Sequence, residues 1–239
     1  MFKTAASRWG SAIHNNLPPF RLNDEEIPGL MITAAAIQID GPSAILGQSA
    51  PIHLRRRSLL PATGMMEFDI ADLEQLEANG TLINVIMHEM GHVLGFGTLW
   101  ERMGLLQGIG THDPRFIGRN AMTEFARLVG SQIPIPIPVE NIGEIGTKNS
   151  HWRDSIFGNE VMTSILGGSL NPMSRLTLAA LQDMGYSVKI DAADAFVLPN
   201  ANQLASIRAD QATDHRQQEG CNCKHRQSKT HEFAQSITR

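Results

Sequence analysis

Residues 82–97 read LINVIMHEMGHVLGFG, and this stretch decides how the chain is interpreted. Apolar residues recur at helical spacing until Gly95, where a helix is expected to end. On such a helix His88 and His92, four residues apart, share one face, so their imidazoles can bind one zinc ion. Glu89 lies about 100° further around the helix, where its carboxylate can take a proton from a metal-bound water.

The alternative for this motif is a pair of core histidines with ordinary hydrogen-bond partners.

Two histidines and a water leave tetrahedral zinc one ligand short. The compact long form of the motif would place a third histidine at position 98, which is Thr98 and a poor zinc ligand. Taken alone, the residues leave several candidates for the third ligand open: Glu101, His112, Asp113, Glu124 and His151.

Away from this helix, apolar periodicity and turn residues predict further elements. Helices are expected over 1–15, 70–79 with Asp69 as N-cap, 120–129 with Asn120 as N-cap, and 174–184. Residues 30–39 are expected to form a buried strand, 43–54 an extended segment, and 98–118 a loop. The alternating prolines of 133–139 predict an extended surface segment. From residue 201 the composition turns polar, which predicts a disordered tail.

Composition excludes several classes of protein. The chain has 239 residues and a formal net charge of −4, which argues against a nucleic-acid binder with a basic face. Its two cysteines, Cys221 and Cys223, are too close together to join distant segments. No apolar run reaches the roughly 18 residues of a membrane helix, and no signal peptide is visible after Met1.

Several stretches together resemble the leishmanolysin family of zinc metallopeptidases, the M8 peptidases, which belong to the metzincins. The resemblance extends over roughly residues 1–200. The stretches that carry it are HEMGHVLGFG (88–97), SHW (150–152), NEVM (159–162), NPMSRLTLAALQDMGY (171–186) and LPATG with Phe68-Asp69 (60–69).

The resemblance assigns roles to particular residues. It implies His88, His92 and His151 as ligands of one catalytic Zn²⁺ and Glu89 as general base. It also implies that Met162, eleven residues after His151, is the methionine of a Met-turn beneath the metal. The alternative for Met162 is a core methionine. Glu160 either orients this turn or a ligand histidine, or is a surface carboxylate.

The resemblance also implies the fold and the activity. The expected fold class is α+β: a twisted sheet with a long active-site helix over residues 1–97, and a smaller C-terminal part over 98–200 after the Gly95 turn. The expected function is zinc-dependent hydrolysis of peptide bonds, as an endopeptidase acting on peptide or protein substrates. The substrate is expected to pair with an edge strand within 43–52, at Ile45, Leu46, Gly47 and Gln48; the alternative is an ordinary strand.

The chain departs from the family in ways that limit these expectations. Leishmanolysin is larger and rich in disulfides, whereas no cysteine precedes Cys221 here. Position 164, where some metzincins have a metal-reaching tyrosine, is Ser164, and the only tyrosine, Tyr186, is expected in the core. The family is commonly exported or surface-attached, yet no export signal is visible, which leaves a cytoplasmic location open. The oligomeric state is undetermined.

Two further hypotheses follow from the residues. The chain could be a zinc-stabilised binding or adhesion module without turnover, although such a module has no need of the base Glu89. The tail 201–239 contains Cys221 and Cys223, and cysteine is a residue type that binds zinc. The tail could therefore fold back and occupy the open position on the metal as an inhibitory latch.

Overall fold

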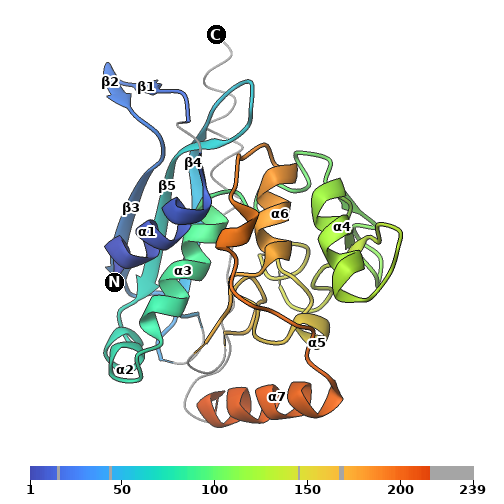
Figure 1. The fold of residues 1–239 in the computed structure, drawn as a ribbon. Coiled ribbons are helices and arrows are strands. Elements are labelled where there is room, and N and C mark those ends of the chain that lie inside the picture. The colour runs from blue at the N-terminus through green and yellow to red at the C-terminus, as the bar shows by residue number, and fades with distance from the viewer. Residues whose placement is uncertain (15–16, 43–44, 145, 167–169, 216–239) are drawn as a thin grey trace.

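The computed structural model describes residues 1–14, 17–42, 45–144, 146–166 and 170–215. Figure 1 shows a sheet with two helices against it in the N-terminal half and a second group of helices in the C-terminal half. This mixed arrangement confirms the α+β class expected from the sequence. No helix among the described residues is both long and apolar enough to cross a membrane.

The N-terminal half is built on a three-stranded sheet of order β3-β5-β4. Strand β3 runs parallel to the central strand β5, and β4 runs antiparallel to it. Helix α3 packs against β4 and β5 and is covered in turn by α1 (Figure 1). The elements of this half are α1 (Phe2–Ala12), β1 (Phe20–Leu22), β2 (Glu25–Ile27), β3 (Met31–Ile37), β4 (Gly47–Leu54), β5 (Pro61–Asp69), α2 (Leu73–Ala78) and α3 (Leu82–Val93).

The C-terminal half consists of helices joined by long loops and one small sheet of order β6-β7-β8. Helices α4 and α6 pack against each other (Figure 1). The elements are β6 (Leu106–Gln107), β7 (Arg115–Phe116), α4 (Arg119–Leu128), β8 (Ile137–Pro138), α5 (Asp154–Phe157), α6 (Arg175–Asp183), a 3-10 helix (Ile190–Ala192) and α7 (Ala201–His215).

Helix α3 lies close to the sheet because glycine leaves room for it. A Cβ on Gly64 of β5 would lie 2.3 Å from Cγ1 of Val93 on α3. On the opposite side, the indole Nε1 of Trp9 in α1 donates to the carbonyl of Met87, 3.0 Å away. The helix that carries the HEMGH motif is therefore fixed both by the sheet and by the N-terminal helix.

The predicted helices and strands are present, but two of the predicted N-cap residues are wrong. Asp69 does not cap α2, because the N-cap residue of that helix is Asp72. The Asp69 carboxylate instead accepts hydrogen bonds from four backbone N–H groups, those of Ile39, Asp40, Gly41 and Ala71. Gly118, not Asn120, is the N-cap of α4. The orphan N–H groups of Asn120 and Ala121 are bound by Asp183 of α6, which a local sequence pattern does not reveal.

Three predictions about exposure and order are also corrected. Strand β3 is mostly exposed rather than buried, because it lies at the sheet edge away from helix α3, which packs against β4 and β5. The proline-rich segment is only partly at the surface, since Ile137 and Val139 are fully buried and β8 pairs with β7. The expected disordered tail begins as helix α7, and residues 216–239, with Cys221 and Cys223, lie outside the described residues.

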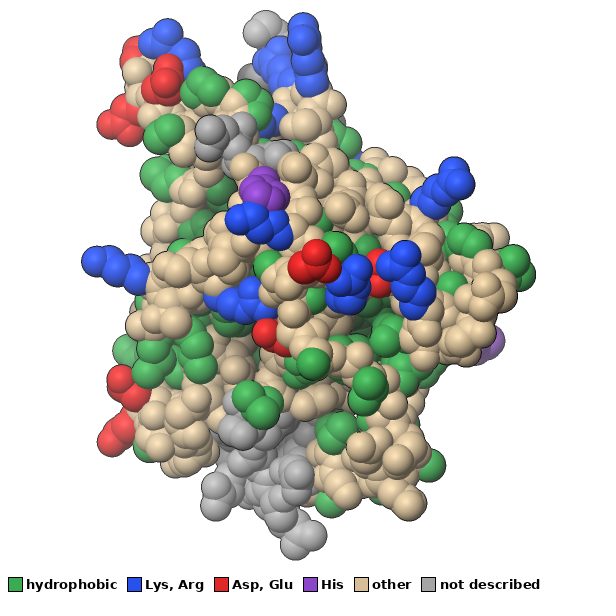
Figure 2. Space-filling view, in the orientation of Figure 1, with side chains coloured by type: hydrophobic (Ala, Val, Ile, Leu, Met, Phe, Trp, Pro, Cys, Tyr) green, Lys and Arg blue, Asp and Glu red, His purple; other side chains and the backbone are tan. Residues whose placement is uncertain are grey.

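The surface carries charges of both signs. On the face shown in Figure 2, Lys and Arg side chains are interspersed with Asp and Glu, and no continuous basic patch is visible. This distribution agrees with the small net charge of −4.

The buried carboxylate of Glu140 and the half-buried carboxylate of Asp154 brace the chain between residues 140 and 165. Glu140 accepts the backbone N–H of Asp154, 3.0 Å away. Asp154 accepts the backbone N–H of Ser164 at 2.8 Å, its hydroxyl at 2.5 Å, and the backbone N–H of Ile165 at 3.4 Å. Burial raises the pKa of Asp154 to about 7, and the charge of Glu140 also raises it, while these hydrogen bonds act in the opposite direction.

This raised pKa predicts how stability depends on pH. Because the folded state favours the protonated acid, the contribution of Asp154 is present near pH 4 and is lost as pH rises through about 7, with a limiting slope of about 1.4 kcal/mol per pH unit. Asp154→Asn keeps the shape and does not ionise. Urea unfolding of both proteins in EDTA should show the variant gaining stability relative to the native chain between pH 5 and pH 8. A difference that is constant over this range would contradict the prediction.

Candidate metal centre

Two histidines of helix α3 and a third from a distant loop meet in the interior. His88 and His92 lie one turn apart on α3, and His151 comes from the loop before α5. The Nε2 atom of His92 lies 2.9 Å from that of His88 and 3.0 Å from that of His151, and His88 and His151 are 3.2 Å apart. All three side chains are fully buried. The structure thus forms a group of three histidines that could hold a metal ion.

The outer nitrogen of each ring faces a backbone carbonyl. The Nδ1 atoms of His88, His92 and His151 lie 2.7, 2.9 and 2.8 Å from carbonyl oxygens. A carbonyl only accepts, so each Nδ1 carries the proton and each Nε2 presents its lone pair to the centre. The carbonyls belong to Val161, Phe96 and Thr147.

This arrangement suits a cation. Burial lowers the pKa of His88 to about 4, so the imidazole is neutral near pH 7. Three unprotonated nitrogens at this spacing repel one another, and a cation among them attracts all three. Nitrogens bound 2.0–2.1 Å from a tetrahedral zinc lie roughly 3.3 Å apart, close to the observed separations. The donor set and its spacing therefore fit a zinc ion.

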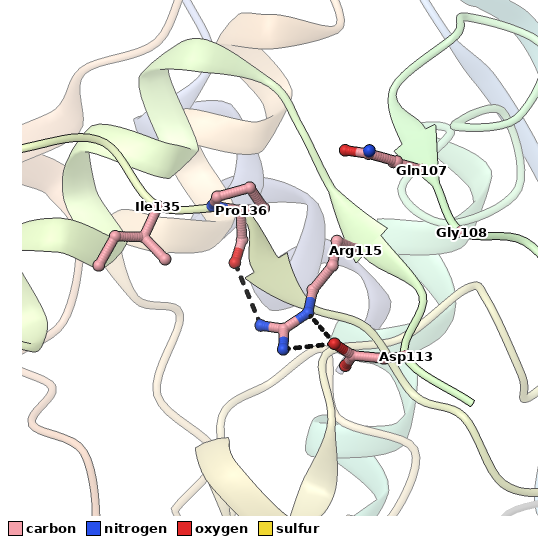
Figure 3. Close-up of a pocket in the computed structure, with 6 residues that line it drawn as sticks. All are labelled: Gln107, Gly108, Asp113, Arg115, Ile135 and Pro136. Carbon is pink, nitrogen blue, oxygen red and sulfur yellow. Dashed lines mark hydrogen bonds and ion pairs between the residues drawn. The ribbon is translucent and has the colours of Figure 1, made fainter. Parts of the chain in front are cut away.

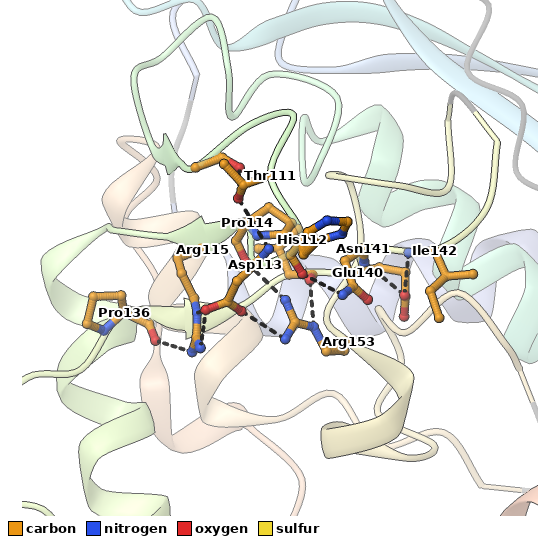
Figure 4. Close-up of polar contacts among 12 residues, drawn as sticks. Thr111, His112, Asp113, Pro114, Arg115, Pro136, Glu140, Asn141, Ile142 and Arg153 are labelled. Atoms are coloured by element: carbon orange, nitrogen blue, oxygen red, sulfur yellow. Dashed lines mark hydrogen bonds and ion pairs between the residues drawn. The ribbon is translucent and has the colours of Figure 1, made fainter.

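The other candidates for a third ligand lie elsewhere. Glu101 and His112 are exposed, and Glu124 forms ion pairs with Arg127 and Arg175. Asp113 pairs with Arg115 and Arg153, as Figure 4 shows.

The Asp113–Arg115 pair also borders an open pocket of about 450 Å³ (Figure 3). None of the three histidines lines it, so the pocket is separate from the candidate metal centre. Gln107, Gly108, Asp113, Arg115, Ile135 and Pro136 form its walls.

Glu89 lies buried between α3 and the edge strand β4. A Cβ on Gly47 would be 3.3 Å from both Cγ and Oε1 of Glu89, so a side chain here would make a tight contact with the glutamate. The hydroxyl of Ser49, two residues along β4, donates to the Glu89 carbonyl at 2.9 Å. Of the residues predicted to pair with substrate, Gly47 and Gln48 begin β4, while Ile45 and Leu46 precede it and are buried.

Met162 is fully buried and packs against α3 beside the motif. A Cβ on Gly91, the residue before His92, would lie 2.5 Å from the Met162 sulfur. Tyr186 is also in the core, where its hydroxyl donates to the carbonyl of Leu94.

Glu160 is not a surface carboxylate, since its side chain is fully buried. It accepts hydrogen bonds from Met162 and Ser174, so it braces the turn directly. Burial raises the pKa of Glu160, while these hydrogen bonds act in the opposite direction.

Sequence reasoning missed the backbone groups around the site. The carbonyls that orient the histidines have no side-chain signature, so no residue pattern points to them. The close approach of Gly97 to Ser150, the residue before the third histidine, did leave a signal, because Gly97 is the second glycine after the motif. A Cβ on Gly97 would lie 2.0 Å from the carbonyl oxygen of Ser150, and its φ is +71°.

Gly97→Ala should therefore weaken metal binding as well as stability. The methyl group has to displace Ser150 and with it His151, while the left-handed backbone adds about 1–2 kcal/mol of strain. Gly104→Ala is the matched control, because Gly104 has a φ of +69° but no atom within 4 Å of its Cβ position. Zinc affinity by chelator competition should fall only in Gly97→Ala; equal affinity in the two variants would show that the close approach is unimportant.

Comparisons with known proteins agree with this geometry. The model of the leishmanolysin family, peptidase M8, matches residues 34–214. The ciliated left-right organizer metallopeptidase of Xenopus laevis is 26% identical over 144 residues, covering 53% of this chain and 20% of that protein. A leishmanolysin homolog of Crithidia fasciculata is 26% identical over 133 residues, with the same shares of the two chains. This chain spans about a fifth of these relatives. Because the family model covers most of its length, the chain belongs to the leishmanolysin family of metallopeptidases.

Proposed function

We propose that the chain is the catalytic part of a zinc-dependent endopeptidase. The observation that carries the proposal is the convergence of three buried imidazoles close to a buried glutamate and an edge strand. His88, His92 and His151 would hold one zinc ion, with Met162 as the Met-turn residue packed beneath α3. Residues 1–97 and 98–200 would then be the two parts of a metzincin-like catalytic domain, with the metal between them.

The chemistry divides between the ion and the protein. A zinc ion in such a site supplies Lewis acidity, which acidifies water and polarises a peptide carbonyl. Glu89 follows a ligand histidine on α3, so its carboxylate can accept a proton from the attacking water and deliver it to the departing amine. The three backbone carbonyls hold the imidazoles in the tautomer that a metal requires.

Strand β4 offers a place for an extended substrate. The backbone N–H of Asp69 donates to the carbonyl of Leu46 at 3.1 Å, so the backbone of Leu46 faces β5. By the alternation of an antiparallel ladder, Gly47 and Ser49 direct their N–H and C=O groups to the other side. No described strand pairs with β4 on that side. A peptide added there would pair beside Glu89 through its own backbone.

Pro51 limits this binding edge. It occupies the next outward-facing position after Gly47 and Ser49 and has no N–H to donate. Pairing should therefore concentrate near Glu89. Because a strand edge binds main chain and requires no peptide terminus, this arrangement favours an endopeptidase.

Glu89→Gln should separate metal binding from catalysis. The amide cannot act as a base, so kcat/KM on a quenched peptide should fall about 10²- to 10⁴-fold while zinc content stays near one per chain. Glu101→Gln, at an exposed glutamate in the following loop, should keep full activity. If the native chain and Glu89→Gln bind zinc and are equally inert on broad peptide libraries, the protein is a silent zinc-stabilised module instead.

His151→Ala tests the third ligand. With one of three nitrogens removed, zinc measured after dialysis should be lost, together with activity. His112→Ala is the control, because His112 is exposed and lies outside the group of three. Retained zinc and full activity in His151→Ala would refute the assignment.

A further inference from the structure

A single buried carboxylate connects the segments that carry two of the three histidines. Both oxygens of Glu160 accept hydrogen bonds, although the side chain is fully buried. Oε2 accepts the backbone N–H of Met162 at 2.7 Å. Oε1 accepts the backbone N–H and the hydroxyl of Ser174 at 3.0 and 2.6 Å, and the hydroxyl of Thr177 at 2.6 Å.

The first connection leads to His88. The bond to Met162 closes the turn over residues 160–163, which is also held by the backbone N–H and hydroxyl of Thr163 on the Glu160 carbonyl. The residue inside this turn is Val161, whose carbonyl accepts from Nδ1 of His88 at 2.7 Å. Glu160 therefore fixes the backbone group that orients the first histidine.

The second connection leads to His151. Trp152, the next residue, is fully buried, and its indole Nε1 donates to the Thr177 hydroxyl at 2.9 Å. Because that hydroxyl accepts from the indole, its own proton is available for Glu160. The backbone N–H of Trp152 also donates to the Met162 carbonyl at 3.0 Å. The Trp152 ring and backbone are thus both tied to the Glu160 turn.

We propose that Glu160 is a positioning residue for the metal centre, acting on His88 through Val161 and on His151 through Thr177 and Trp152. This inference rests on the proposed function, in which these histidines bind zinc. If Glu160 only anchored the start of α6, its hydrogen bonds with Ser174 and Thr177 would be sufficient. The additional bonds through Met162 and Trp152 join α6 to both histidine-bearing segments.

The test uses the full chain and measures Zn²⁺ affinity by chelator competition, with the melting temperature in EDTA recorded separately. Glu160→Gln presents an N–H group where an acceptor is required, so affinity should fall about 10- to 100-fold. Thr177→Val removes the link to Trp152 and should weaken binding about tenfold, whereas Thr177→Ser keeps the hydroxyl and should stay within about threefold of the native chain. The visible spectrum of the Co²⁺-loaded protein should shift in Thr177→Val and not in Thr177→Ser.

The outcomes separate this inference from the proposed function. If the native chain binds zinc and cleaves peptides, but Glu160→Gln and Thr177→Val bind zinc as the native chain does, only the positioning role is overturned. If Thr177→Ser is as weak as Thr177→Val, the hydroxyl link is overturned even where Glu160→Gln fails to fold. A native chain that binds no zinc overturns the proposed function and the inference with it. Asp183→Asn is the control for loss of a carboxylate that binds backbone N–H groups away from the histidines, and it should leave zinc affinity unchanged.

Discussion

The structure depends on bringing the Nε2 atoms of three histidines to within about 3 Å of one another in the interior. His88 and His92 come together because they lie one turn apart on a helix, but His151 is 59 residues further along the chain than His92. Most of the features around the centre bring these histidines together. The sheet and α1 hold α3 in place, glycine at position 97 lets the loop before α5 approach, and Trp152 packs into an aromatic cluster with Phe96 and Trp100.

Carboxyl groups that accept several hydrogen bonds fix the loops of the C-terminal half. Its sheet has only two-residue strands, and long loops join its helices. Glu140, Asp154 and Glu160 each collect several backbone or hydroxyl donors from these loops. A buried carboxylate is costly unless its acceptors are satisfied, and this requirement makes each of the three a strong constraint on the local path of the chain.

Much of the fold could be predicted from the sequence where a single periodic segment carried the signal. Helix α3 and helix α6 are examples, since their apolar spacing and glycine ends are local. The resemblance selected His151 among the third-ligand candidates, whereas spacing alone could not, because a loop can return any of them to the helix. Asp69 and Asp183 show the same limit: both carboxylates bind backbone donors, and those of Asp183 lie about sixty residues away in the chain. The exposure of β3 was mispredicted because an apolar run does not reveal whether a strand is central or at an edge.

The proline of strand β4 has a consequence for the behaviour of the protein in concentrated solution. An open sheet edge is a template for pairing between molecules, and it becomes a seed for aggregates when it is long and uninterrupted. Pro51 has no N–H group, so it interrupts the row of outward-facing backbone donors along β4. Pro51 thus limits pairing between copies of the chain along β4, whereas the exposed edge strand β3 contains no proline.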